Sequence, residues 1–132
     1  MKKFTILTIA LTAMALLLAA CGGDSGPVAL SFEGNDTFQF TPASAAVSAG
    51  DEVEVTLTNV GALEHSFAVV AAGVDLNTVT DSEAINSSAT GAVAAGQTGA
   101  ITFTAPAAGT YQFVCTVAGH AAAGMVGTFT VN

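Results

Sequence analysis

The chain has 132 residues and a formal charge of −8 at pH 7, because ten Asp and Glu residues face only two basic residues, Lys2 and Lys3. A protein so poor in Lys and Arg lacks the positive surface that nucleic acids attract, so we expect no nucleic-acid partner. The chain also has only two His, two Cys and three Met. So few possible ligands exclude a multicopper enzyme and argue against a copper-storage protein, which would be rich in Met or Cys.

The N-terminal segment has the pattern of an export signal. Residues 1–3 (MKK) are followed by an uncharged, mostly apolar run over residues 4–18 and then by Ala-Ala-Cys. A basic start, a short apolar run and small residues before a cleavage point are typical of a secretory signal peptide. The run is short for a bilayer span, which needs roughly 20 residues. Residues 17–21 (LLAAC) resemble the lipobox of bacterial lipoproteins, in which the Cys carries lipid.

We therefore expect residues 1–20 to be a lipoprotein signal peptide, Cys21 to be lipidated, and residues 21–27 to form a flexible linker to a domain over 28–132. The protein would be exported and anchored by lipid to a bacterial membrane, on its periplasmic or extracellular face. A retained anchor helix is the alternative for the apolar run. A disulfide between Cys21 and Cys115 is disfavoured, because it would join a flexible tail to a residue expected inside a sheet.

Removal of residues 1–20 would change the charge of the protein. Lys2 and Lys3 would be lost and all ten acidic residues kept, so the formal charge would go from −8 to −10. This acidity would attract a partner with a basic docking face. It would serve equally well as a simple aid to solubility.

Alternating apolar and polar residues predict an all-β domain. In DEVEVTLTN, Val53, Val55 and Leu57 alternate with polar residues and should face the core. Other short runs rich in Val, Thr, Phe or Ala are separated by turn-forming Gly, Pro, Asn and Asp. The expected strands are 28–32, 37–40, 45–48, 52–59, 65–70, 99–104, 109–115 and 124–131. Several short strands with turns between them favour a sandwich.

Residues 73–97 interrupt this pattern. They are rich in Ser, Thr, Asn and Ala and show only a weak helical turn over 81–85. A connection of this length inside a compact domain is unusual and is commonly functional. We expect a partly ordered flap.

Four side chains beyond the signal form a candidate metal site. Cys115, His120 and Met125 follow one another with four residues in each gap, and His65 lies fifty residues before Cys115. Two imidazoles, a thiolate and a weak axial thioether are the ligands of a blue-copper electron-transfer site. Each residue alone is more often an ordinary core or hydrogen-bonding residue, but their joint spacing predicts a metal site. Zn²⁺ is the alternative ion. Copper is favoured because such sites generally bind Cu²⁺ more tightly than Zn²⁺ and because zinc does not need a thioether ligand such as Met125.

Over residues 40–132 the sequence resembles the cupredoxins, the family of plastocyanin, azurin, rusticyanin and auracyanin. The matching segments are PASAAVSAGDEVEVTLTNVG, His65 followed by Ser66, APAAGTYQFVC, CTVAGHAAAGM and GTFTVN. The four residues between Cys115 and His120 and the four between His120 and Met125 resemble the ligand spacing of auracyanin and rusticyanin. The resemblance implies a Greek-key β-sandwich of about eight strands with a flap. It also implies one type 1 copper per chain, held by a plane of His65, Cys115 and His120 and by axial Met125.

Two departures from the family concern the surroundings of the ligands. Val117 and Ala118 stand where the family often has an aromatic residue and a Pro, and the carboxylate of Glu64 directly precedes the first ligand. Neither removes a ligand. Hydrogen bonds from Ser66 and Thr116 between the ligand loops should tune the reduction potential.

This set of residues predicts a one-electron carrier and not an enzyme. Its partners would be donor and acceptor redox proteins, and the protein would be a monomer. They would dock on a patch of small residues around His120, which consists of Val117, Ala118, Gly119, Ala121, Ala122, Ala123 and Gly124. Two alternatives remain: a copper carrier or delivery protein, and a metal-free surface sandwich that acts as an interaction module.

Overall fold

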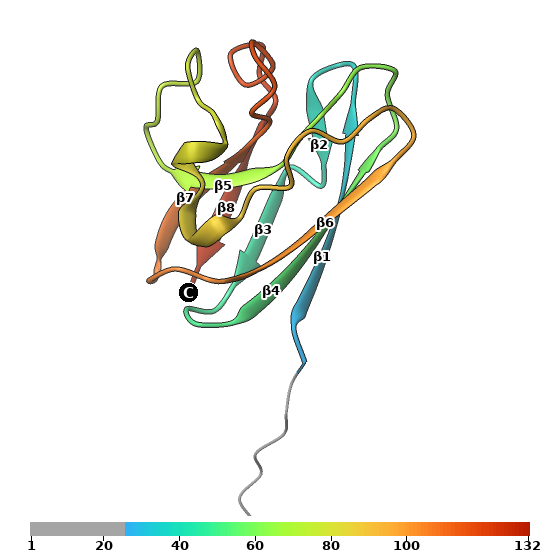
Figure 1. Ribbon diagram of the computed structural model, residues 1–132. Coiled ribbons are helices and arrows are strands. Elements are labelled where there is room, and N and C mark those ends of the chain that lie inside the picture. The colour runs from blue at the N-terminus through green and yellow to red at the C-terminus, as the bar shows by residue number, and fades with distance from the viewer. Residues whose placement is uncertain (1–25) are drawn as a thin grey trace, which may run out of the picture.

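Two four-stranded β-sheets pack face to face in the computed structural model, which describes residues 26–132 (Figure 1). One sheet has the strand order β2-β1-β4-β6 and the other β3-β8-β7-β5. The all-β sandwich expected from the sequence is confirmed. The expected signal peptide and the lipidation site at Cys21 lie outside the described residues. Within residues 26–132, no helix has the length and apolar character needed to cross a membrane.

The eight strands fall where the alternation pattern predicts them, with shifts at their ends. They are β1 (Val28–Asn35), β2 (Gln39–Thr41), β3 (Ser44–Val47), β4 (Glu52–Asn59), β5 (Ala68–Ala71), β6 (Thr98–Thr104), β7 (Gly109–Val114) and β8 (Val126–Val131). Two short 3-10 helices, η1 (Asp81–Glu83) and η2 (Ile85–Ser87), lie between β5 and β6. They occupy the region where a weak helical turn is expected.

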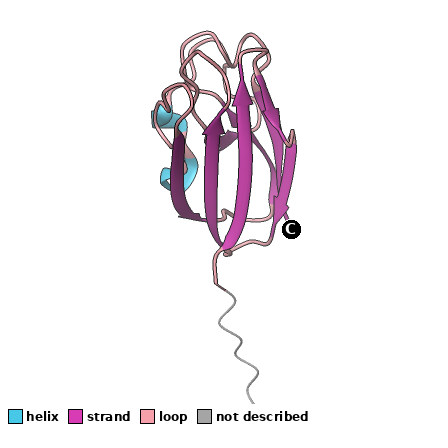
Figure 2. Cartoon of the chain, turned by 90° about the vertical axis from the view of Figure 1, so that its right-hand side faces the viewer, coloured by secondary structure: helices cyan, strands magenta, loops and turns pink. Residues whose placement is uncertain are grey.

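Both sheets are mixed, and this arrangement gathers the functional loops at one end. β1 runs parallel to β4 and β3 runs parallel to β8, whereas the other paired strands are antiparallel. The loops that follow β1, β4 and β7 all lie at the same end of the sandwich, the upper end in Figures 1 and 2. The described chain begins at the opposite end, where β1 starts.

The core is built from the inward faces of both sheets. Val53, Val55 and Leu57 of β4 are each 0% exposed, as their alternation predicts. Four phenylalanine rings pack beside them with centroids 4.8–5.9 Å apart, namely Phe32, Phe40, Phe67 and Phe113. Cys115 and Met125 belong to the same buried cluster. Two of the candidate ligands therefore rest on close-packed aromatic side chains, where packing restricts their movement.

Residues 73–97 form a flap that is fastened to the segment around β5. Thr90 N–H donates to the carbonyl of Phe67 (2.9 Å) and Val93 N–H to that of His65 (2.7 Å), while the Ser88 hydroxyl accepts from Val69 N–H (3.1 Å). These bonds cover β5, which is the outer strand of its sheet. β5 begins at Ala68, opposite Val114, where β7 ends, because Ser66 N–H donates to Cys115 Sγ and not to a backbone carbonyl.

Candidate metal centre

Three of the four candidate ligands meet at the loop end of the sandwich. The possible ligand atoms of His65, Cys115 and His120 all lie within 4.8 Å of one another. Cys115 Sγ lies 3.5 Å from His120 Nδ1, and the centroids of the two imidazole rings are 5.1 Å apart. His65 comes from the connection between β4 and β5, and the other two from the loop between β7 and β8. A centre that joins both sheets is thus assembled from positions fifty residues apart.

The loop over residues 115–125 closes on itself and brings Met125 to the same place. Cys115 N–H donates to the Met125 carbonyl (3.1 Å), and Met125 N–H donates to the His120 carbonyl (3.0 Å). Gly119 and Gly124, which directly precede His120 and Met125, have φ of 84° and 110°, conformations that favour glycine. Met125 is fully buried, so its thioether lies on the core side of the loop.

One nitrogen of His65 is held by a carboxylate and the other is left without a partner. Nε2 lies 3.1 Å from Asp36 Oδ1. An ionised carboxylate only accepts hydrogen bonds, so this contact places the ring proton on Nε2 and a lone pair on Nδ1. In residues 26–132, His65 Nδ1 is the one buried side-chain nitrogen or oxygen with no hydrogen-bond partner.

A buried acceptor without a partner costs free energy, commonly about 1–3 kcal/mol, so its persistence calls for an explanation. Here the lone pair belongs to an imidazole beside a thiol and a second imidazole, which are soft and borderline donors. A borderline or soft metal ion is the partner that this donor set suits. The residues present therefore fit a copper centre.

Asp36 is the functional residue that the sequence did not reveal. It lies in the turn between β1 and β2 and accepts hydrogen bonds from the backbone N–H groups of Ala62 (2.7 Å) and Leu63 (3.2 Å) as well as facing His65. The pKa of Asp36 is held below its ordinary value of 3.8 mainly by these backbone bonds and to a smaller extent by the contact with His65. Asp36 thus fixes both the His65 ring and the loop before it.

Glycine at position 61 makes this approach possible. A Cβ atom at Gly61 would overlap Asp36 Oδ1, only 2.0 Å away, and would lie 3.1 Å from His65 Nε2. Glu64, the carboxylate that adjoins His65 in the sequence, is exposed and has no side-chain hydrogen bond to the described residues. The carboxylate that touches the first candidate ligand is therefore Asp36.

His120 is partly exposed and neutral at physiological pH. Burial lowers the pKa of His120 below its ordinary value of 6.5, and the proximity of His65 lowers it further, whereas Asp36 opposes the shift. The Phe38 ring packs against it, with centroids 4.8 Å apart. A neutral imidazole keeps a lone pair free for a metal ion.

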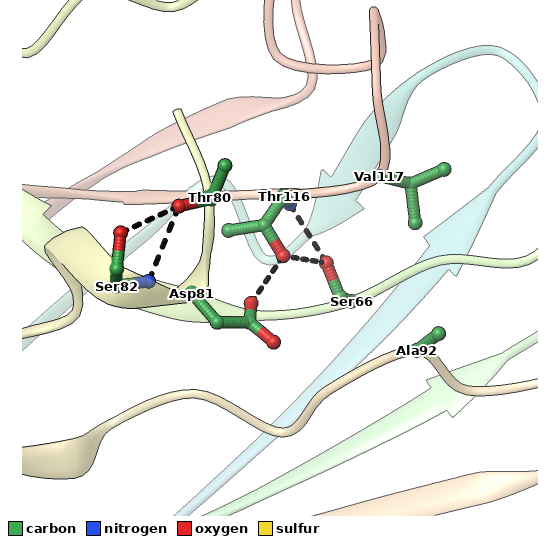
Figure 3. A pocket seen from close by; sticks show the side chains of 7 residues that line it. All are labelled: Ser66, Thr80, Asp81, Ser82, Ala92, Thr116 and Val117. Carbon is green, nitrogen blue, oxygen red and sulfur yellow. Dashed lines mark hydrogen bonds between the residues drawn. The ribbon is translucent and has the colours of Figure 1, made fainter. Parts of the chain in front are cut away.

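The sulfur of Cys115 is enclosed and receives a backbone hydrogen bond. Cys115 is 0% exposed, and Ser66 N–H donates to its Sγ (3.3 Å). The Ser66 hydroxyl accepts from Thr116 N–H (2.7 Å) and lies 2.8 Å from the Thr116 hydroxyl (Figure 3). The two residues expected to link the ligand loops thus contact each other beside the sulfur.

The expected docking patch needs one correction. Ala121 is only 2% exposed and packs against a second buried cluster that includes Val70, Val79 and Val114, under the flap. The prediction that Ala121 is a surface residue is therefore wrong. The physical reason is that residues 119–124 form a tight turn, closed by hydrogen bonds from Ala123 N–H to the Gly119 carbonyl and from Gly124 N–H to the Ala121 carbonyl (both 3.0 Å). This turn directs Ala121 inward, whereas Ala118, Ala122 and Ala123 are exposed and Val117 is partly buried.

Known proteins of one family match the chain over nearly all of the described region. The family of copper binding proteins known as the plastocyanin/azurin family matches residues 27–132. Auracyanin-A of Chloroflexus aurantiacus is 32% identical, over 83% of this chain and 86% of its own length. Plastocyanin of Prochlorothrix hollandica is 35% identical, over 94% of this chain and 87% of its own.

A solved structure agrees with these relatives. Dithionite-reduced auracyanin from the photosynthetic bacterium Roseiflexus castenholzii superposes with a TM-score of 0.69 and 31% identity, covering 81% of this chain and 99% of that one. The expected resemblance is confirmed, and with it the cofactor, one type 1 copper. The chain belongs to the plastocyanin/azurin family of copper-binding proteins and is a cupredoxin similar to auracyanin.

Proposed function

We propose that this protein carries single electrons between redox proteins. The observation that carries the proposal is the buried lone pair of His65 Nδ1, which has no partner and lies beside the Cys115 sulfur and His120. A metal-free interaction module would leave this atom unsatisfied. A site with one thiolate and two imidazoles has no second cluster of metal ligands near it in residues 26–132, which suits a carrier better than an enzyme.

In this proposal His65, Cys115, His120 and Met125 would hold the copper. The bound ion would supply the Cu(I)/Cu(II) couple, which stores and releases one electron. The protein keeps the donors in place: Asp36 orients His65, and the backbone bonds of residues 115–125 hold the other three. Ligands that move little between oxidation states keep the reorganisation energy of electron transfer low.

The proposed docking surface surrounds the partly exposed edge of His120. It consists of Val117, Ala118, Ala122 and Ala123, with the buried Ala121 now excluded. The loop before His65 adds two exposed apolar side chains, Val60 (54% exposed) and Leu63 (47%). A small apolar surface of this kind suits the brief encounters of redox proteins.

The position of the first strand supports a lipid tether at Cys21. Val28 begins β1 at the end of the sandwich opposite the metal centre (Figure 1). A chain anchored through lipid just before this strand would hold the centre away from the membrane surface. We propose this arrangement at the outer face of a bacterial membrane, after removal of residues 1–20. A partner with a basic docking face would complement the acidic domain.

Protein-film voltammetry of the copper-loaded protein tests this function. A carrier should give a reversible one-electron wave and keep its copper over many cycles. A copper-delivery protein should instead pass Cu(I) readily to a competing chelator in its reduced form. Rapid loss of copper to the chelator together with an irreversible wave would contradict the electron-carrier proposal and favour delivery.

A further inference from the structure

Besides the backbone bonds between Val93 and His65, the flap makes a side-chain contact with the loop that follows β7. Asp81, the first residue of η1, accepts a hydrogen bond from the hydroxyl of Thr116, the residue after Cys115 (Figure 3). The Thr116 hydroxyl lies 2.8 Å from that of Ser66, and the Ser66 hydroxyl lies 3.6 Å from Cys115 Sγ. An unbroken line of polar contacts therefore joins the flap to the sulfur.

The direction of the hydrogen bonds along this line follows from counting protons. An ionised carboxylate can only accept, so Thr116 must give its single hydroxyl proton to Asp81. Thr116 can then only accept at its contact with Ser66, and the Ser66 proton is directed to Thr116. The Ser66 oxygen meanwhile accepts from Thr116 N–H (2.7 Å).

This direction leaves the sulfur with fewer donors. The Ser66 hydroxyl is also within donating distance of Cys115 Sγ (3.6 Å), but its single proton is taken by the shorter contact with Thr116 (2.8 Å). The sulfur keeps the hydrogen bond from Ser66 N–H (3.3 Å). Hydrogen bonds to the cysteine sulfur tune the reduction potential of a type 1 copper site, because they stabilise negative charge on the thiolate. A sulfur that receives one such bond fewer donates more electron density and favours the oxidised state.

We propose that Asp81 is a positioning residue of the metal centre. It draws the Ser66 hydroxyl proton away from the Cys115 sulfur through Thr116 and so holds the reduction potential low. The inference rests on the proposed function, because it concerns the potential of the copper site. It adds an electronic role to the flap, whose other described contacts are packing and the hydrogen bonds to residues 65–69.

Asp81 can be replaced without disturbing the core because of where it lies. Asp81 is exposed and lines a cavity of about 410 Å³ together with Ser66, Thr116, Thr80, Ser82 and Val117. A smaller side chain at this position leaves no buried void. Changes at Asp81 should therefore alter the hydrogen bonds without disturbing the core.

The test compares reduction potentials of the copper-loaded wild type with those of Asp81→Ala, Thr116→Val and Ser66→Ala. Thr116→Val should raise the potential most, because Cys115 Sγ becomes the nearest acceptor for the Ser66 hydroxyl. Asp81→Ala should raise it in the same direction. Asp75→Ala, which removes another flap carboxylate that bonds only within its own turn, controls for the loss of one negative charge.

We call the line of hydrogen bonds from Asp81 through Thr116 to Ser66 the relay. The double variant Ser66→Ala/Asp81→Ala distinguishes an effect of Asp81 through the relay from an effect of its charge through space. If Asp81 acts through the Ser66 hydroxyl, its substitution should change the potential in the wild type but not in the Ser66→Ala background. A rise of equal size in both backgrounds, or no rise in either, would overturn the inference.

A second readout needs no copper. In the metal-free protein the Thr116 hydroxyl proton should exchange slowly and be visible by NMR, and Asp81→Ala should abolish this protection. A rapidly exchanging proton in the wild type would overturn the relay, whatever the copper spectrum shows. A wild type that lacks a thiolate-copper absorption band but retains the protected proton would contradict the proposed function and support the relay.

Discussion

His65 and Asp36 are joined by a contact of 3.1 Å between Nε2 and Oδ1, although Asp36 lies in the turn between β1 and β2 and His65 in the connection between β4 and β5. The contact determines which imidazole nitrogen carries the proton, and so leaves Nδ1 free to bind metal. The Asp36 side chain is 38% exposed, so its importance lies in this geometry and not in a buried charge pair.

Asp36→Ala should weaken copper binding. Without the carboxylate, the His65 ring loses the partner that fixes its proton and its orientation, and such losses commonly reduce metal affinity by about 10–100-fold. Competition with a Cu(I) chelator measures the change. Asp51→Ala is a matched control, because Asp51 also accepts a backbone hydrogen bond (Ser48 N–H, 2.8 Å) but precedes β4 at the other end of the sandwich. Equal affinities for wild type and Asp36→Ala would refute the role of Asp36.

Ala122→Glu should slow electron exchange and leave the absorption spectrum unchanged. Ala122 is exposed on the proposed docking surface, where a bulky charge hinders close approach of another protein. The self-exchange rate between oxidised and reduced copies, measured from NMR line widths, should fall at least several-fold. Ala108→Glu adds the same charge at the exposed turn between β6 and β7, at the far end of β7, and should have a much smaller effect. Equal rates for the two variants would show that exchange does not use the proposed surface.

Ala121→Leu should destabilise the domain. Ala121 is 2% exposed, and inserting a larger side chain into a packed core typically costs about 1–3 kcal/mol. Urea unfolding of the metal-free protein measures this cost. The neighbouring exposed Ala122→Leu should change the unfolding free energy by no more than about 0.5 kcal/mol. A fully stable Ala121→Leu variant would mean that the loop can turn this residue outward.

Acid should destabilise the metal-free domain partly through the flap. The hydroxyl and N–H of Thr80 and the hydroxyl of Ser82 donate to Glu83 and lower the pKa of Glu83 below its ordinary value of 4.5. The unfolded chain therefore binds this proton more readily than the folded one. The resulting stability is complete above pH 4.5 and is lost as the pH falls through the lower folded pKa.

Unfolding free energies of Glu83→Gln should thus depend less on pH in this acidic range than those of the wild type. Glu64→Gln is the control, because the exposed Glu64 makes no side-chain hydrogen bond to the described residues. Identical pH profiles for Glu83→Gln and the wild type would exclude this contribution.

The strands could be predicted because their pattern is local. Alternation in DEVEVTLTN identifies the buried face of β4 directly, since successive residues of a strand point to opposite faces. The ligand spacing was equally local for Cys115, His120 and Met125, which share one loop. His65 lies outside this loop, but it is one of only two His residues in the chain, and this marks it as a candidate ligand.

Other features depend on contacts that no local pattern encodes. Asp36 lies 29 residues before His65, and nothing in NDTF marks it as a partner of an imidazole. The run HAAAG contains three alanines, and only the turn geometry decides that Ala121 is the buried one. The flap is ordered by hydrogen bonds that the Ser88 and Thr90 hydroxyls accept from the distant backbone N–H groups of Val69 and Phe67, which a sequence rich in Ser and Thr does not specify.

Spectroscopy of residues 22–132 after addition of Cu(II) shows whether Cys115 and its neighbours hold a type 1 copper ion. We expect an intense visible thiolate charge-transfer band and a narrow copper hyperfine splitting in the electron paramagnetic resonance spectrum, both absent from Cys115→Ser. A colourless wild-type protein that binds no copper, or a spectrum unchanged in Cys115→Ser, would refute a type 1 copper site.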